Sequence, residues 1–201
     1  MPQTLADVLD LQLKNKTDAF LEAVARMADD RDAICAALLD GRKYRTIDDV
    51  TLSAGDTHDR GRSVTVFHTD AGKLVYKPHD MRLDGQLYLF AERFFSEFVG
   101  IPRSLAFGDR YGVCEFIEKR RAEGYEEAER FWYALGGLTA FVKLLRSTDL
   151  HYQNILCCGA KPYIIDLETI ISPVSSEQTE YEQSTQTRKH LLRTPGASLI
   201  M

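Results

Sequence analysis

The chain has 201 residues, of which 44% are hydrophobic and 27% are charged, a composition typical of a soluble globular protein. The formal net charge of −5, with Lys and Arg spread along the sequence, argues against nucleic acid as a partner. With no run of about 18 apolar residues and no apolar signal core, the sequence predicts no membrane span and a cytoplasmic location. The four cysteines lack C-x-x-C spacing, so we expect buried thiols and no zinc.

The first 50 residues are predicted to form a helical segment. Apolar residues recur at helical spacing from Phe20 to Met27 and again from Ile34 to Leu39, and the pattern extends over 4–49. No set of reactive side chains occurs here. We therefore expect this segment to pack against the rest of the fold or to serve as a docking surface.

Residues 51–122 are predicted to form a β-rich lobe that binds nucleotide or phosphate. A polar, glycine-flanked loop at 55–62 leads into a strand at 63–67, and a tight turn then leads into a second strand at 73–78. Such a loop can cover phosphate groups with backbone amides, although no P-loop sequence is present.

Three side chains of this lobe are candidates for chemistry. Lys77 ends the second strand, where it is placed like a phosphate-binding lysine, and an exposed strand lysine is an equally good interpretation. Asp56 and His58 are two residues apart, so in an extended segment both lie on one face and can form an acid/base pair. A turn-stabilising Asp beside an exposed His is about as common, so this pair needs other support.

A helix is predicted directly after the Lys77 strand. An apolar stripe at three- and four-residue spacing runs from Leu83 to Phe98 and is closed by Gly100. A helix in this place would suit a lysine–glutamate ion pair. Glu92 and Glu97 are the candidate partners of the lysine, and the sequence does not choose between them.

Residues 123–171 are predicted to supply a catalytic helix and loop. A helical pattern over 126–146 has a wide apolar face, so this helix should be buried. It leads to T-D-L-H-Y-Q-N at 148–154, which is followed by a short apolar hairpin and by I-D-L-E-T at 165–169. The remaining residues, 172–201, are predicted to form a polar loop and a short end.

The carboxylate and amide groups of this loop have a spacing that suits phosphoryl transfer. Asp149 can orient a hydroxyl while Asn154, five residues later, binds a metal ion. Asp166, at the end of the next hairpin, can hold the same magnesium ion, and His151 and Glu168 lie beside these groups. The loop therefore predicts magnesium-dependent phosphoryl transfer.

Four motifs in order resemble the dehydratase domain of class II lanthipeptide synthetases, the LanM enzymes. They are G-D-T-H-D-R-G-R-S-V, K-L-V-Y-K-P, T-D-L-H-Y-Q-N and I-D-L-E-T, at 55–64, 73–78, 148–154 and 165–169. The resemblance implies an α+β, truncated kinase-like fold with N-terminal helices, a small antiparallel sheet lobe and the beginning of a helical C-lobe that carries the catalytic loop. It also implies that ATP is used to phosphorylate Ser and Thr of a ribosomal precursor peptide, and that phosphate is then eliminated to leave dehydroamino acids.

The resemblance carries roles onto individual residues. Asp149 would orient or deprotonate the substrate hydroxyl, with His151 beside it, and Lys77 would contact phosphate. Asp56 and His58 match the family motif tied to the elimination step, which favours the acid/base interpretation of this pair.

The metal site is also implied by the resemblance. Asn154 and Asp166 would hold Mg²⁺, and Glu168 would support that site. Gln153 stands where the family more often has Glu, and Asp59 where Asn is usual. Neither difference removes one of these roles.

The resemblance also implies a truncated chain, because LanM proteins continue through the rest of the dehydratase and a zinc-dependent cyclase. We expect the isolated chain to be marginally stable, to associate with the remainder of a synthetase, or to be a gene fragment. One alternative is a non-catalytic or fragmentary kinase-like protein that binds nucleotide or peptide without turnover. Another is a small-molecule transferase similar to aminoglycoside kinases, which the G-D-T-H motif makes less favoured.

Overall fold

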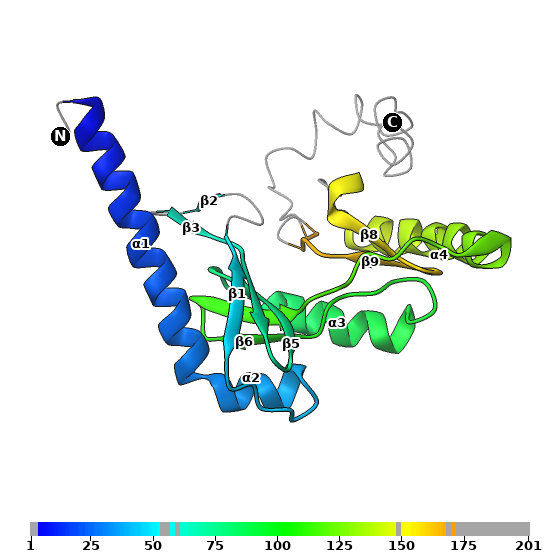
Figure 1. The fold of residues 1–201 in the computed structure, drawn as a ribbon. Coiled ribbons are helices and arrows are strands. Elements are labelled where there is room, and N and C mark those ends of the chain that lie inside the picture. Colours follow the sequence, from blue (N-terminus) through cyan, green and yellow to red (C-terminus); the bar gives the residue numbers. More distant parts are fainter. Residues whose placement is uncertain (1–3, 53–56, 59–60, 148–149, 168–169, 172–201) are drawn as a thin grey trace. The chain divides into compact units, whose positions relative to one another are not determined.

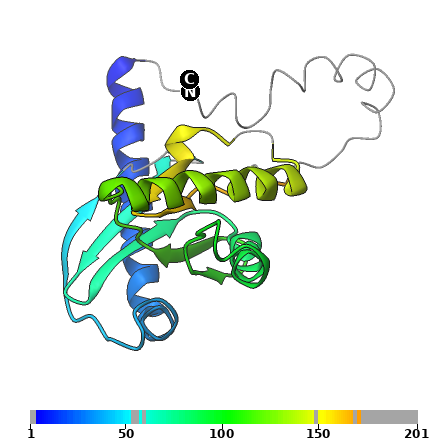
Figure 2. The same ribbon diagram turned by 90° about the vertical axis from the view of Figure 1, so that its right-hand side faces the viewer.

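A computed structural model describes residues 4–52, 57–58, 61–147, 150–167 and 170–171 (Figures 1 and 2). Within these residues the fold is α+β, with four α-helices and an antiparallel five-stranded sheet, as the sequence predicts for the fold class. The chain divides into two compact units. Unit 1 comprises 1–86 and 103–116, and unit 2 comprises 87–102 and 117–201.

Two helices open unit 1. Helix α1 spans Leu5–Asp29 and begins with a capping box, in which Thr4 Oγ1 accepts the Asp7 N–H and the Asp7 carboxylate accepts the Thr4 N–H. Helix α2 spans Arg31–Leu38. The predicted helical segment is wrong at its end, since Ile47–Thr51 form strand β1, where β-branched residues favour an extended backbone.

The sheet of unit 1 has the strand order β1-β4-β5-β7-β6, and every neighbouring pair is antiparallel. The predicted hairpin is present as strands β4 and β5, joined by a turn at Asp70 and Ala71. A separate two-stranded ladder, β2 with β3, carries Thr57, His58, Arg62 and Ser63 of the G-D-T-H-D-R-G-R-S motif. The bounds are β2 Thr57–His58, β3 Arg62–Ser63, β4 Thr65–Thr69, β5 Gly72–Lys77, β6 Ser104–Phe107 and β7 Tyr111–Glu115.

The core of unit 1 lies where the two helices cover the sheet. Phe67 and Leu74, from the central strands β4 and β5, are fully buried, as are Met27 of α1 and Ile34 of α2. These four belong to one apolar cluster, so their burial orders the sheet against the helices.

Unit 2 is built on helix α4, Gly124–Leu145, and on the hairpin of strands β8, Ile155–Cys158, and β9, Lys161–Ile164. A single 3₁₀ turn, Tyr152–Asn154, precedes β8. Helix α3 spans Arg82–Phe94; its residues up to Gln86 belong to unit 1 and those from Leu87 onward belong to unit 2.

Helix α4 is buried on one side among the described residues. Leu138, Phe141 and Val142 are fully buried in the apolar cluster of unit 2, as predicted from the helical stripe. Trp132 and Tyr133 are 66% and 73% exposed, so the apolar face is narrower than the sequence suggested. No helix in the described part of the chain is long and apolar enough to cross a membrane.

Candidate functional site

Lys77 is buried at the end of strand β5. Its side chain is 9% exposed, and its Nζ lies 4.0 Å from Oδ1 of Asp84, whose side chain is equally buried. Asp84 lies in the first turn of α3, where the N–H groups of the helix terminus favour a carboxylate. An exposed strand lysine is therefore excluded, and Lys77 is an ammonium group held beside a buried acid.

The ion-pair partners predicted for Lys77 from the sequence are wrong. Glu92 and Glu97 are both exposed, and the buried carboxylate near the lysine is Asp84, which the sequence analysis missed. The loop between β5 and α3 is short, so it brings the first turn of the helix, rather than its later turns, to the end of the strand. That loop length was the signal that could have identified Asp84.

A close contact fixes the start of α3 against the sheet. Gly112 pairs with Lys77 in the β5–β7 ladder, and a Cβ on Gly112 would lie 2.7 Å from both Cβ and Sδ of Met81. The missing side chain of Gly112 thus leaves the space that Met81 fills. Because Met81 directly precedes α3, this packing positions Asp84 relative to Lys77.

The buried thiol beside this ion pair is inert. Burial raises the pKa of Cys114 to about 12, with the positive charge of Lys77 opposing this shift and the negative charge of Asp84 adding to it. A thiol with such a pKa stays protonated at neutral pH, and it is the thiolate that reacts. Cys114 therefore belongs to the core rather than to the chemistry.

The residues assigned to elimination fall partly outside the described part of the chain. Asp56 lies outside the described residues. For His58 the structure describes the backbone but not the side chain. His58 sits in β2, where it is the register partner of Arg62 in β3. The motif thus places His58 on a hairpin and not in the free loop that the sequence suggested.

In unit 2 the end of α4 leads abruptly into the loop that was predicted to be catalytic. The Ser147 N–H donates to Val142 O and the Arg146 N–H donates to Lys143 O, both at 3.2 Å, which is the pairing of a Schellman cap. Arg146 takes the left-handed conformation, with φ of 57°. Asp149 lies outside the described residues, and Leu150 returns to the apolar core.

His151 caps the 3₁₀ turn that follows. Its Nδ1 accepts the backbone N–H of Gln153 at 3.3 Å. A neutral imidazole with an acceptor at Nδ1 carries its proton at Nε2. His151 is half-buried, so this N–H is a candidate donor at the loop.

The structure brings Asn154 and Asp166 to the same end of the β8–β9 hairpin. The Ile165 N–H donates to Asn154 O at 3.0 Å, next to the last register pair of the ladder, Ile155 with Ile164. The amide of Asn154 and the carboxylate of Asp166 are oxygen ligands of the kind that Mg²⁺ prefers while it keeps several waters.

Glu168, the third residue assigned to the metal site, lies outside the described residues. Across the described ranges no group of three or more His, Cys, Asp or Glu side chains is arranged to hold a metal ion. The metal-binding candidates that the structure describes are thus Asn154 and Asp166, one amide and one carboxylate.

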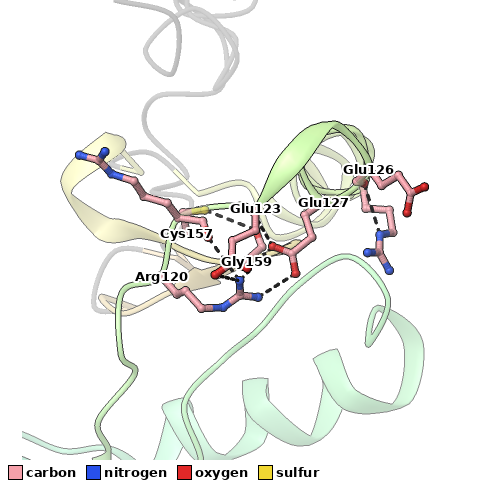
Figure 3. A network of polar contacts seen from close by, with 8 residues as sticks. Arg120, Glu123, Glu126, Glu127, Cys157 and Gly159 are labelled. Carbon is pink, nitrogen blue, oxygen red and sulfur yellow. Dashed lines mark hydrogen bonds and ion pairs between the residues drawn. The ribbon is translucent and has the colours of Figure 1, made fainter.

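The hairpin is held from one side by the segment that enters α4 (Figure 3). The Arg120 N–H donates to Cys157 O and the Gly159 N–H donates to Arg120 O, both at 2.9 Å. The guanidinium of Arg120 donates to both carboxylate oxygens of Glu127, each at 2.9 Å. Gly159 has a φ of 64°, which favours glycine, and a Cβ there would lie 1.8 Å from Nη2 of Arg120, so the guanidinium would have to move.

The ion pair between Arg120 and Glu127 lowers the pKa of the Glu127 carboxyl group. The hydrogen bonds from Arg120, and after them the backbone N–H of Glu123, lower the pKa of Glu127 to about 2.

A second backbone segment holds the β8–β9 hairpin from its other side. The Gly100 N–H donates to Pro162 O and the Ile164 N–H donates to Gly100 O, both at 2.9 Å. The hairpin that carries Asn154 is therefore clamped by two backbone segments that are distant in sequence.

Comparisons with known proteins agree with these motifs. The family model described as "Domain of unknown function (DUF4135)" matches residues 3–198. The chain belongs to this family. It is also 27% identical, over 179 residues, to the lacticin 481/lactococcin biosynthesis protein LcnDR2 of Lactococcus lactis subsp. lactis. That match covers 82% of this chain and 19% of LcnDR2, so this DUF4135 chain spans about a fifth of its relative's length.

The DUF4135 match and the similarity to LcnDR2 confirm the resemblance to part of a class II lanthipeptide synthetase. The roles assigned to individual residues remain predictions.

Proposed function

We propose that this DUF4135 chain is a segment of a lanthipeptide biosynthesis dehydratase. In this proposal it phosphorylates Ser and Thr of a ribosomal precursor peptide with ATP and then eliminates phosphate to give dehydroamino acids. The proposal is carried by the similarity to a lantibiotic biosynthesis protein over most of the chain, together with the four motifs in order. The buried Lys77 supports it, as does the position of Asn154 and Asp166 at the same end of the β8–β9 hairpin.

A kinase-like division of labour is part of the proposal. Unit 1 would act as the sheet lobe that binds nucleotide, with Lys77 contacting phosphate. Unit 2 would begin the helical lobe and supply the catalytic loop. Asn154 and Asp166 would hold Mg²⁺ with Glu168 in support, and the bound ion would neutralise charge on the phosphates.

The first chemical step would use the loop of unit 2. Asp149 would accept the proton of the substrate hydroxyl while its oxygen forms a bond to the γ-phosphorus of ATP and ADP leaves. His151, with its proton at Nε2, would hydrogen-bond to the developing charge beside it. Positioning and electrostatic stabilisation supply most of the rate enhancement in such transfers.

The second step would use the motif of unit 1. Asp56 and His58 would take up the α-proton of the phosphorylated residue and assist the departing phosphate. The electron pair of the broken Cα–H bond forms the new C=C bond, and the Cβ–O pair leaves with phosphate. This step consumes the phosphoryl ester that the first step makes, so a defect confined to it leaves phosphopeptide behind.

Mass spectrometry of a precursor peptide co-expressed with the chain tests the proposal. We expect loss of water at Ser and Thr for the wild type, neither phosphate nor water loss for Asp149→Asn, and retained phosphate for His58→Ala. A folded wild-type protein that yields neither product contradicts the proposed activity. Nucleotide binding that survives Asp149→Asn, in a protein without turnover, would instead support a non-catalytic binding protein.

A further inference from the structure

The second half of the G-D-T-H-D-R-G-R-S motif makes contacts that the proposed chemistry does not use. Gly61 and Arg62 follow the elimination residues in sequence, and Arg62 is the register partner of His58 in the β2–β3 ladder. Both face helix α1, and all of these residues belong to unit 1. The contacts are of two independent kinds, one steric and one ionic.

The steric contact is made by Gly61. A Cβ on this residue would lie 3.2 Å from the backbone N of Lys16 and 3.3 Å from the backbone C of Asn15. Gly61 also has a φ of 82°, a conformation that side chains rarely allow. The absence of a side chain therefore lets the hairpin backbone approach the backbone of α1.

The ionic contact is made by Arg62. Its Nε donates to Glu22 Oε2 at 2.9 Å, and Glu22 Oε1 lies 2.5 Å from Nη2 of Arg26. Arg26 Nη1 in turn donates to the Tyr76 hydroxyl at 2.6 Å. The hydrogen bond from Arg62 lowers the pKa of Glu22 against the opposing effect of burial, so the carboxylate is ionised at neutral pH.

This series of contacts connects the β2–β3 hairpin with strand β5. One end is the β2–β3 hairpin, which carries His58, and the other is Tyr76, the residue before Lys77 in strand β5. Arg26 is held at the second end by a further contact, since its guanidinium carbon lies 4.4 Å from the ring centre of Tyr111. Helix α1 thus bridges the hairpin and the strand through side chains that are one third exposed or less.

We infer that α1 is a positioning element for the elimination motif: Glu22 and the helix backbone at Asn15 and Lys16 anchor the β2–β3 hairpin, and with it His58, relative to the strand that ends in Lys77. Gly61 and Arg62 are in the motif because they make this anchor. The inference rests on the proposed function only for the role of His58 in elimination. The contact between α1 and the β2–β3 hairpin is a separate, structural claim.

Hydrogen exchange of the full 201-residue chain tests the anchor directly. Glu22→Ala should speed exchange of the β2–β3 amides by roughly threefold to tenfold, since the lost ion pair is partly exposed. Asp18→Ala is the matched control: it removes one exposed carboxylate from the same helix, one turn earlier, and should leave this exchange unchanged. Unchanged exchange in Glu22→Ala, or equal acceleration in both variants, would overturn the anchor.

A second pair of variants distinguishes loss of the ionic contact from loss of folding. Arg62→Ala should reproduce the faster exchange, whereas Arg62→Lys keeps a positive charge at Glu22 and should restore most of the protection. If the lysine variant exchanges as fast as the alanine variant while helix content stays at the wild-type value, the ionic contact does not anchor the hairpin.

Product analysis tests the role in elimination. With precursor peptide, Glu22→Ala should leave the phosphorylation rate within about twofold of wild type and raise the fraction of retained phosphopeptide at least about fivefold, because only the hairpin is displaced. Equal loss of both steps would contradict a positioning role and indicate general destabilisation. If the wild type makes no phosphopeptide, the proposed function fails, and the exchange experiment still decides the anchor.

Discussion

Two neighbouring glycines in helix α4 should respond to the same substitution with opposite signs. Among the described residues, and apart from its own turn of helix, no atom lies within 4 Å of a Cβ built on Gly136. A Cβ on Gly137, in contrast, would lie 2.2 Å from Cγ and 2.5 Å from Cβ of Phe98. These atoms are at the base of the phenylalanine side chain, so the ring cannot simply swing away. Phe98 itself is anchored two residues before Gly100, whose backbone pairs with β9.

The magnitudes follow from helix propensity and from packing. Gly→Ala in a helix interior stabilises by about 1 kcal/mol, which should be the full effect of Gly136→Ala. Gly137→Ala has the same gain but adds an overpacking cost of about 1–3 kcal/mol, so its net effect should be a loss of roughly 0–2 kcal/mol. The free energies of unfolding of the two variants should therefore differ by about 1–3 kcal/mol.

Thermal and urea unfolding followed by circular dichroism would measure this difference. For a chain of this size we expect Tm to rise by about 2–4 °C for Gly136→Ala and to stay level or fall for Gly137→Ala. In a Phe98→Gly background, which removes both the Cβ and the ring that obstruct this position, Gly137→Ala should become stabilising. Equal stabilisation by both single variants would refute the packing of Phe98 on α4, and with it the clamp on the β8–β9 hairpin.

Two further predictions concern charged groups. The pKa of Glu127 is lowered to about 2 by Arg120, so its contribution to stability is complete above the unfolded value near 4.5 and is lost as the pH falls towards 2. Glu127→Gln should therefore flatten the acid limb of a stability–pH profile between these values, and an unchanged limb would contradict the ion pair. Asp84→Asn should weaken nucleotide binding by about tenfold, because it removes the buried carboxylate beside Lys77. Asp80→Asn breaks only the exposed Asp80–Arg82 pair and should leave the affinity for nucleotide unchanged. Calorimetric titration with ATP and Mg²⁺ would check this, and equal affinities for both variants would show that Asp84 does not position Lys77.

Local patterns predicted the parts of the fold that are determined within a few residues. The β4–β5 hairpin and the β8–β9 hairpin were predicted because two strand-like runs flank a turn that contains glycine. The relation of Asn154 to Asp166 follows from that second hairpin, so the sequence was enough to place both at one end of it. Short-range geometry carries this kind of information.

The sequence patterns missed features that depend on contacts between distant segments. Strands β1 and β6 are the two edges of the sheet, and the acidic Asp48 and Asp49 in β1 concealed its strand character although charges are ordinary on an edge. Asp84 was missed as the partner of Lys77 because its position depends on Met81 packing over Gly112.

The most direct test of the proposed phosphoryl transfer follows the γ-phosphate of ATP. A precursor peptide incubated with the chain, Mg²⁺ and γ-labelled ATP should acquire label on Ser or Thr, and Asp149→Asn and Asp166→Asn should each abolish the transfer. His58→Ala should keep the label on the peptide, because phosphate is then not eliminated. No labelled peptide from a folded wild-type protein, or equal labelling by the Asp149→Asn variant, would contradict the account.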